Sequence, residues 1–395
     1  DAYVNMLKKY AKVTVVSDTN LDGLVEKLQP YNYVIIGFHK SNLNPWKSYK
    51  FSNKELVWLH EIARKKSVVL DVFASPYSLL QIKSFANIEG VIVSYQNSKL
   101  AQEISAQLLF GAFAAKGKLP VSIGTKFKEG FGIANTSLSR FEYTIPEAAG
   151  LSSKKLALID QMADTIISEK MAPGFQVFVA RNGKVVLDKS FGYHTNDQKV
   201  KVKNSDIYDV ASLTKILASL PLIMKAEEEG RIRLTDSLGA LLPHFSDSNK
   251  DTVTVKEILS HFGRLKSWIP FYKGTQDSIT GKNLEQFYRK DQSANFKVKV
   301  AEDLFIKENY KDSIYKYIKE ADQTESIGYT YSDLGYYIFK EVLENTYKKP
   351  LNKLADEVFY QSLGADRTTY LPLNKFHKSE IVPTEVDTYY RNQLL

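Results

Sequence analysis

The sequence predicts two structural classes in one chain: an N-terminal α/β domain with a parallel sheet, and an α+β domain that begins near residue 151. The α/β prediction rests on short, nearly continuous apolar runs that alternate with stretches of helical spacing over residues 1–123. The α+β prediction rests on an amphipathic helix and a hairpin signal that follow residue 151. A chain of 395 residues has the length of two or three domains.

Four apolar runs in the first part are predicted to be strands, namely residues 13–16, 33–37, 67–72 and 90–93. They are rich in β-branched residues and nearly continuous, which is typical of strands covered on both faces. The intervening segments have helical spacing, as in residues 53–65. This repetition predicts a parallel sheet with helices on both sides. No glycine-rich phosphate loop follows the first run, so we expect no nucleotide site there.

Residues 124–150 are predicted to be a linker, because several glycines interrupt any regular period. Ser152 or Ser153 is placed to cap a helix over residues 154–170 with one apolar stripe. Two strand patterns, at 175–180 and 184–188, then flank Asn182-Gly183, which is the strongest short-range hairpin signal. A helix, a hairpin and further helices predict α+β architecture rather than another parallel unit.

Composition excludes several classes of function. The chain has 53 Lys+Arg and 45 Asp+Glu, and this mild excess of +8 is scattered, so we expect no nucleic-acid partner. It has no cysteine, and its six histidines lack the spacing of a zinc-binding helix, so we expect no metal and no cofactor. No apolar run approaches the roughly 20 residues of a membrane span, and Asp1 opens the chain without a basic segment or an apolar signal core, so we expect no signal peptide in it. We expect a soluble chain that is a processed or trimmed piece.

One short pattern indicates nucleophilic chemistry. A serine without a histidine partner can use a lysine as its base. Ser212 and Lys215 are three residues apart, so their side chains share a face if a helix begins at the serine. The first N–H groups of that helix would also face an oxyanion. The small Ala211 precedes the serine, and an apolar helix is predicted through Met224. In that apolar setting, beside another cation, we expect the lysine pKa to fall from about 10.4 towards neutrality.

The Ser-x-x-Lys pattern by itself is weak evidence, because it occurs at 152–155, 212–215 and 313–316. We interpret 152–155 as a helix cap on a solvated face and 313–316 as a surface helix. Only 212–215 is followed by a long apolar helix that would bury it. The alternative at 212–215 is a buried serine at a helix start, with a lysine that extends to solvent.

The surroundings of this pattern resemble a known family. Residues 207–215, Ile-Tyr-Asp-Val-Ala-Ser-Leu-Thr-Lys, are similar to the active-site segment of class C β-lactamases and related penicillin-binding serine hydrolases, among them carboxypeptidases, esterases and transesterases. Further segments resemble other blocks of that family in the same order: 173–177, 191–193, 234–238, 242–245 and 254–261. The resemblance implies a β-lactamase-like domain over about residues 146–395, with Ser212 as nucleophile and Lys215 as general base.

The family's second motif is Tyr-x-Asn, and its matching position here is Tyr331-Ser332-Asp333. The resemblance implies that Tyr331 shuttles a proton and that residue 333 binds substrate. The alternative for Tyr331 is a core tyrosine at a helix start. Asp333 departs from the asparagine, and a carboxylate there would stabilise the protonated form of Lys215. Ser332-Asp333 also resembles the Ser-Asp-Asn of class A enzymes, but Leu334 occupies the third place.

The family's third motif, Lys-Thr-Gly or His-x-Gly on an inner strand, does not occur between Asp333 and Leu395. Residues 381–387 resemble the stretch that precedes that strand, so we expect the domain to be incomplete at Leu395. Residues 265–325 are longer than the family needs between its motifs. We expect a helical insertion near the mouth of the site.

The first part of the chain has its own resemblance. Residues 108–121, Leu-Leu-Phe-Gly-Ala-Phe-Ala-Ala-Lys-Gly-Lys-Leu-Pro-Val, are similar to the end of the second, α/β domain of family-3 glycoside hydrolases. In the β-N-acetylglucosaminidase branch, the catalytic residues belong to a preceding barrel domain that this chain lacks. We therefore expect residues 1–123 to be a structural remnant without glycosidase residues.

Together these resemblances imply an acyl-enzyme mechanism on an amide, ester or β-lactam carbonyl. The setting they imply is bacterial peptidoglycan metabolism, with a small-molecule or muropeptide substrate and a periplasmic or secreted location. Asp333 and the missing third motif favour the alternative, a non-catalytic muropeptide-binding module. A third hypothesis, adhesion to an anionic wall polymer or nucleic acid, predicts an affinity that falls steeply with salt. The oligomeric state is open.

Overall fold

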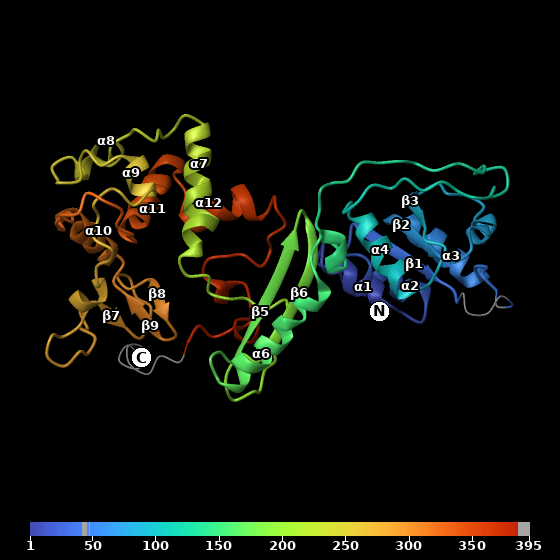
Figure 1. The fold of residues 1–395 in the computed structure, drawn as a ribbon, viewed down its shortest axis with the longest axis horizontal. Coiled ribbons are helices and arrows are strands. Elements are labelled where there is room, and N and C mark those ends of the chain that lie inside the picture. The colour runs from blue at the N-terminus through green and yellow to red at the C-terminus, as the bar shows by residue number, and fades with distance from the viewer. Residues whose placement is uncertain (42–45, 47, 386–395) are drawn as a thin grey trace. The chain divides into compact units, whose positions relative to one another are not determined.

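The computed structural model describes residues 1–41, 46 and 48–385 of the chain (Figure 1). The chain divides into two compact units, Asp1–Asn204 and Ser205–Leu395. This division differs from the predicted boundaries at 123 and 151, because the helix and hairpin that follow residue 151 belong to the first unit. Each unit is described separately.

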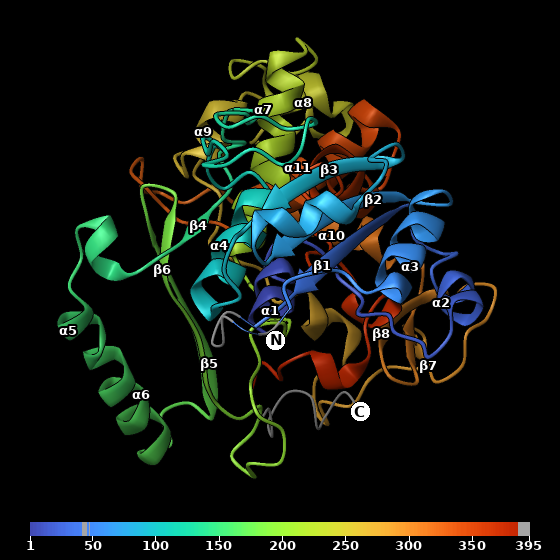
Figure 2. The ribbon, with the colours of Figure 1, turned by 90° about the vertical axis from the view of Figure 1, so that its right-hand side faces the viewer.

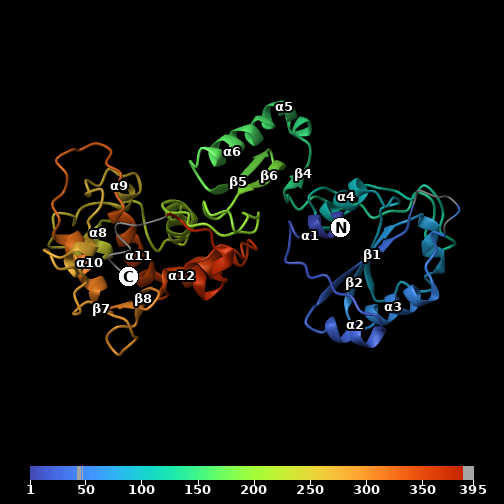
Figure 3. The ribbon, with the colours of Figure 1, turned by 90° about the horizontal axis from the view of Figure 1, so that it is seen from below.

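The first unit begins with a parallel sheet of strand order β1-β2-β3. Helices α2 and α3 cover one face of this sheet, and α1 and α4 cover the other (Figure 3). The predicted α/β fold of residues 1–123 is therefore confirmed. The elements are β1 (Tyr33–His39), β2 (Ser67–Phe73), β3 (Ile88–Val93), α1 (Ala2–Leu7), α2 (Leu21–Lys27), α3 (Asn53–Ala63), η1 (Pro76–Gln81) and α4 (Lys99–Leu109).

The central strand β2 shows why both faces are covered. Val68, Leu70 and Val72 pack with α2 and α3, while Phe73 packs with α1 and α4. Because side chains alternate across a strand, a nearly continuous apolar run supplies two cores at once. The strand predicted at residues 13–16 is wrong, since these residues belong to no strand of the described chain. The side chains of Val13 and Val16 do pack on the cores, but a strand also needs a partner for its backbone groups.

The predicted helix and hairpin also form. The strands β5 (Gly174–Arg181) and β6 (Lys184–Gly192) pair antiparallel, with positive φ at Asn182 and Gly183. Strand β4 (Glu142–Tyr143), in the predicted linker, adds parallel to β6, and η2 (Pro146–Ala149) follows it. The predicted helix over 154–170 is in two pieces, α5 (Ser153–Leu156) and α6 (Leu158–Ser168). Helix α6 runs beside the hairpin, and Asp160 on α6 pairs with Lys189 on β6 (Figures 1 and 2).

The second unit is mainly helical around one apolar core. Helices α7 and α11 contribute most of the fully buried side chains, among them Leu222, Ile338 and Phe339. Of the described residues, no helix combines the length and the apolar character that crossing a membrane requires. The helical elements are η3 (Lys215–Ser219), α7 (Leu220–Glu228), α8 (Leu238–Leu241), η4 (Pro243–Phe245), α9 (Val255–Leu259), α10 (Tyr310–Glu320), α11 (Leu334–Tyr347), α12 (Leu351–Ala355), η6 (Asp356–Tyr360), η7 (Pro372–Asn374) and η8 (Lys378–Glu380).

The prediction that residues 265–325 are helical is wrong for most of this segment. It contains η5 (Phe271–Thr275) and a small antiparallel sheet of order β7-β9-β8, and only α10 is a helix of any length. The sheet strands are β7 (Tyr288–Arg289), β8 (Val298–Ala301) and β9 (Leu304–Ile306). The alternation of lysine and valine in Val298-Lys299-Val300 is a strand pattern with period two, which the overall Lys, Tyr and Asp content of the segment obscured.

Candidate active site

The helix that carries Lys215 begins with a π-helical turn, η3, and continues as α7. Pro221 has no N–H and so cannot bond the carbonyl of Leu217 four residues earlier. The hydroxyl of Tyr360 donates to that carbonyl instead, at 3.1 Å. A proline near the start of α7 therefore widens the turn without leaving a buried carbonyl unpaired, and widened turns of this kind are frequent at functional sites.

The backbone just before this turn presents Ser212. Ala211 has a φ of 44°, which is the left-handed region that residues with a side chain rarely adopt. The N–H of Ala211 donates to Asp209 Oδ1 at 2.8 Å, and the N–H of Lys215 donates to the Ser212 carbonyl at 3.0 Å. The small residue noted before the serine thus sits where a larger side chain would be strained.

The two side chains predicted to share a face do so. Nζ of Lys215 donates to Oγ of Ser212 at 2.9 Å. The expectation that the apolar helix buries both residues is only half right. The Lys215 side chain is 15% exposed, but Ser212 lies at the surface of its unit. The alternative of a buried serine with a lysine that extends to solvent is therefore not what the structure shows.

Tyr331 reaches the same serine from a distant segment, since its hydroxyl donates to Ser212 Oγ at 3.0 Å. The next residue, Ser332, anchors this segment: its Oγ donates to the carbonyl of Lys266 at 2.6 Å, and its N–H donates to Nδ1 of His261 at 3.2 Å. Ser332 is buried, whereas Tyr331 is 42% exposed and so is not a core tyrosine. Helix α11 begins two residues later and fixes the segment to the core through Leu334.

Asp333 forms an ion pair with Lys215, with 2.7 Å between Oδ1 and Nζ. Burial of the ammonium lowers the pKa of Lys215, but the Asp333 carboxylate and the Tyr331 phenol outweigh burial and hold that pKa above its ordinary value. The expected fall of the lysine pKa towards neutrality is therefore wrong. The lysine pKa stays high because Asp333 stands where the family has an asparagine. The sequence argument about a carboxylate at position 333 anticipated this effect.

Tyr331 shifts in the opposite direction. Hydrogen bonds of the Tyr331 oxygen with Ser212 and Lys215 stabilise the phenolate, so the pKa of the Tyr331 phenol lies below its usual value. The Lys215 ammonium also lies 5.3 Å from the centre of the Tyr331 ring. At neutral pH the lysine is thus a cation, and the phenol is the more acidic partner of the two.

Two residues at the site were not assigned a role from the sequence. The ring of His261 lies 4.6 Å from that of Tyr331, and burial together with the Lys215 cation lowers the His261 pKa, so this imidazole is neutral at pH 7. The Tyr336 ring lies 5.6 Å from the Lys215 ammonium. His261 belongs to a segment quoted for the family resemblance, but a lone histidine at a helix end gave no reason to place it beside a tyrosine 70 residues later.

The other occurrences of the short patterns lie elsewhere, as interpreted. Ser152 caps α5 by accepting from the N–H of Lys155, and Lys316 is an exposed residue of α10 that pairs with Glu320. Strict Tyr-x-Asn at 3–5 and 95–97 belongs to the first unit, and the occurrence at 390–392 lies outside the described residues.

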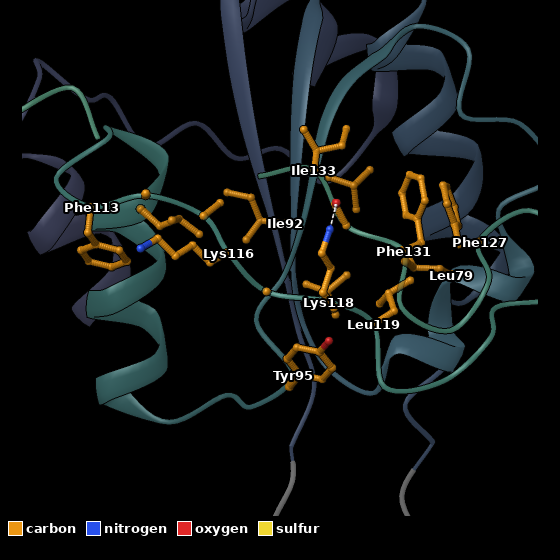
Figure 4. A pocket seen from close by; sticks show the side chains of 17 residues that line it. Leu79, Ile92, Tyr95, Phe113, Lys116, Lys118, Leu119, Phe127, Phe131 and Ile133 are labelled. Carbon is orange, nitrogen blue, oxygen red and sulfur yellow. Dashed lines mark hydrogen bonds between the residues drawn. The ribbon is translucent and has the colours of Figure 1, made fainter. Parts of the chain in front are cut away.

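A pocket of about 400 Å³ lies in the first unit, between β3, α4 and the segment 113–133 (Figure 4). Its lining is apolar apart from Tyr95 and two lysines, Lys116 and Lys118, and Lys118 donates to the carbonyl of Gly132. The lining has no serine, histidine or carboxylate. Among the residues that the structure describes, no three His, Asp or Glu side chains gather as a metal site.

The Ser212, Lys215 and Tyr331 constellation lies inside a segment that matches a family model. The beta-lactamase model matches residues 163–378, which is just over half of the chain. The chain belongs to the beta-lactamase family. This match covers the C-terminal part of helix α6, the hairpin and the second unit as far as residue 378, and it does not extend to the parallel sheet of residues 1–123.

Two bacterial proteins are similar in sequence to parts of this chain. The chain is 36% identical over 130 residues to Protein flp of Staphylococcus aureus (strain NCTC 8325), a match that covers 31% of this chain and 25% of that protein. It is 25% identical over 255 residues to an N-acetylmuramyl-L-alanine amidase of Bacillus subtilis, which covers 60% of this chain and 52% of that protein. The chain thus spans between a quarter and about half the length of these relatives.

Two solved structures are similar to part of the chain at lower identity. A penicillin-binding protein homologue from Pyrococcus abyssi is 17% identical, with a TM-score of 0.44 over 57% of this chain and 47% of the other. A class C beta lactamase from Rhodobacter sphaeroides is 17% identical, with a TM-score of 0.38 over 52% of this chain and 48% of the other.

Proposed function

We propose that this protein is a serine hydrolase that acts through an acyl-enzyme on an amide, ester or β-lactam carbonyl. The observation that supports this function is the meeting of Ser212, Lys215 and Tyr331. The Lys215 ammonium and the Tyr331 phenol both lie within 3.0 Å of the Ser212 hydroxyl oxygen. Two of these residues are 119 positions apart in the sequence. A nucleophile within hydrogen-bond reach of its proton acceptor is the signature of covalent catalysis.

In the proposed reaction, Ser212 Oγ bonds to the carbonyl carbon and gives up its proton to the neighbouring base. The carbonyl electrons move onto oxygen, and when they return, the bond from carbon to nitrogen or oxygen breaks. The leaving group then takes up the transferred proton. Water attacks the acyl-enzyme in a second cycle of the same proton transfers, which releases the acid and restores the serine hydroxyl.

The pKa shifts of Lys215 and Tyr331 indicate different roles for these two residues in the proton transfer. The sequence argument assigned general-base work to Lys215, but Asp333 holds this lysine in its protonated form. Tyr331 has the lowered pKa and lies at hydrogen-bond distance from Ser212. In our proposal the Tyr331 phenolate accepts the serine proton, and the Lys215 cation stabilises that phenolate.

The oxyanion needs hydrogen-bond donors that face the reacting carbonyl. The helical turn after Ser212 supplies the first of these N–H groups in our proposal. In the family to which the chain is similar, a strand after the tyrosine motif supplies the second, and no Lys-Thr-Gly or His-x-Gly occurs between Asp333 and Leu395. The complete reaction therefore depends on a donor that the described residues do not identify.

Bacterial peptidoglycan is the setting we propose, with a muropeptide or a related small molecule as substrate. The Bacillus subtilis relative named as an N-acetylmuramyl-L-alanine amidase supports this setting. The resemblance of residues 108–121 to the second domain of family-3 glycoside hydrolases agrees with it. A periplasmic or secreted location is part of the same proposal.

The second candidate is a non-catalytic muropeptide-binding module. The Lys215–Asp333 ion pair favours it, because a lysine held as a cation is not a base. Labelling of the full-length protein with a fluorescent penicillin separates the candidates, with Ser212→Ala as control. A label that depends on Ser212 supports the hydrolase. Saturable binding that survives Ser212→Ala, without label or turnover, supports the binding module and rejects the nucleophile.

A further inference from the structure

The ion pair at the site has a buried end and an open end. The Lys215 side chain is 15% exposed, and its Nζ faces Ser212. The Asp333 side chain is 44% exposed, so the negative end of the pair is the one that solvent and substrate meet. Only two contacts, of 2.9 and 2.7 Å, separate the nucleophilic oxygen from this carboxylate. The first few substituents of an acyl group on Ser212 would therefore lie within reach of Asp333.

Aromatic rings continue outward from the same site. The His261 ring lies 4.6 Å from the Tyr331 ring and 5.7 Å from the Tyr329 ring, and Tyr329 lies 6.1 Å from Phe262. Tyr329 and Phe262 are 61% and 48% exposed, although large aromatic side chains are usually buried on folding. We call Tyr331, His261, Tyr329 and Phe262 the aromatic strip.

A carboxylate and aromatic faces attract the same kind of ligand. An ammonium gains from an opposite charge within about 4–6 Å. It also gains from the negative face of an aromatic ring within about 6 Å of the ring centre. The imidazole in the strip adds no positive charge at pH 7, because the Lys215 cation and burial keep its pKa low. The open side of the site is therefore negative and aromatic beside the nucleophile.

We propose that Asp333 selects the acyl donor by charge: the site accepts acyl groups that carry an ammonium within a few bonds of the scissile carbonyl, and it disfavours acyl groups that carry a carboxylate there. Aminoacyl amides, aminoacyl esters and amino-substituted β-lactams are the substrate class. This inference rests on the proposed hydrolase function, because it concerns the acyl group that Ser212 receives. The bonds that form and break are those of the acylation step, and the ammonium keeps its proton throughout.

Three penicillins test the inference, because they share one β-lactam core and differ at a single carbon of the acyl side chain. Ampicillin carries an amine there, benzylpenicillin a hydrogen and carbenicillin a carboxylate. The acylation rate constant of the full-length protein is measured for each at pH 6, where the amine is protonated. We expect the order ampicillin, benzylpenicillin, carbenicillin, with roughly a tenfold span, since partly exposed charge pairs contribute modestly. The span should shrink as salt screens the charges.

The decisive variant is Asp333→Asn, which replaces the carboxylate by an amide of the same shape. Its overall rate will change because Lys215 loses its partner, so the readout is the ratio between the three compounds rather than any single rate. We expect that ratio to collapse to within about twofold. The matched control is Glu302→Gln, which removes an exposed carboxylate whose partner is Lys378. This control should keep the full ratio.

Binding to a Ser212→Ala variant distinguishes a failure of the inference from a failure of the proposed function. There no acylation occurs, and equilibrium affinities for the three compounds should show the same order. A preserved order of affinities without any acylation of the unmodified serine would reject the hydrolase and keep the charge selection. Equal rates and equal affinities, or an order that survives Asp333→Asn, would overturn the inference.

Discussion

The carboxylate of Asp333 lies 2.7 Å from the ammonium of Lys215, and the same ammonium donates to Ser212 Oγ at 2.9 Å. The lysine beside the nucleophile is therefore one half of an ion pair. Its partner raises its pKa, and the same cation lowers the pKa of Tyr331. This pairing sets the charge state in which the proposed chemistry begins.

Replacing Asp333 by asparagine should move the rising limb of the pH–rate profile to lower pH. The carboxylate raises the pKa of both Lys215 and Tyr331, so without it the pair loses a proton at a lower pH. Acylation rates measured between pH 5 and 9 check this. Glu302→Gln should leave the limb where it is, and a limb that moves upward in Asp333→Asn would contradict the proposed coupling.

Tyr331→Phe should slow acylation by about 10²- to 10⁴-fold, the usual contribution of a positioned acid–base group. The hydroxyl that bonds Ser212 is lost while the ring beside His261 is retained. Single-turnover labelling measures the rate, and affinity in the Ser212→Ala background should be nearly unchanged. Tyr329→Phe removes an exposed hydroxyl from the neighbouring tyrosine and serves as the control. If both variants acylate at the wild-type rate, the proton route through Tyr331 is wrong.

Position 211 should tolerate glycine but not valine. Ala211 has a φ of 44°, where a β-branched side chain is strongly disfavoured and glycine is not. We expect Ala211→Val to lower the free energy of unfolding by about 1–3 kcal/mol and to reduce labelling of Ser212, since the strained residue orients the serine. Denaturant unfolding followed by circular dichroism measures the first effect. Equal stability of the glycine and valine variants would show that this conformation is not maintained.

Lys250→Met should destabilise the protein by about 1–3 kcal/mol, because it removes the buried ammonium that donates to the carbonyls at the end of α10. Lys250 is almost completely buried, and its Nζ donates to Asn249 Oδ1 at 2.7 Å and to the carbonyls of Lys319 and Ala321 at the end of α10. Unfolding by guanidinium chloride at pH 7 measures the loss. Lys256→Met, on the surface of α9, is the matched control and should change little.

The same lysine should make stability depend on pH. Burial lowers the pKa of Lys250 to about 8, below its unfolded value of 10.5. Between these values the unfolded chain binds more protons than the folded chain, so the free energy of unfolding should rise as the pH increases from 8 to 10.5. The difference between wild type and Lys250→Met isolates this contribution from tyrosines that titrate nearby. A difference that stays constant over this range would contradict the assigned pKa.

Sequence patterns were sufficient where local chemistry decides the structure. β-Branched runs with few polar residues specify strands with two covered faces, and Asn182-Gly183 specifies a tight turn because both residues adopt positive φ. The same approach failed for residues 13–16, which have the composition of a strand but pair with none in the described chain. It also failed for residues 265–325, where only α10 is the predicted helix.

The sequence by itself determined the candidate nucleophile and lysine, because a spacing of three residues at a helix start brings two side chains to one face. It also indicated Tyr331, through a resemblance of the surrounding segment. Only the tertiary structure decided that Asp333 reaches the lysine, so that its pKa rises instead of falling, and that His261 lies against the tyrosine. The physical reason is that a pKa depends on every charge and on the burial around a group, and the residues that supply them here come from segments more than 40 positions apart.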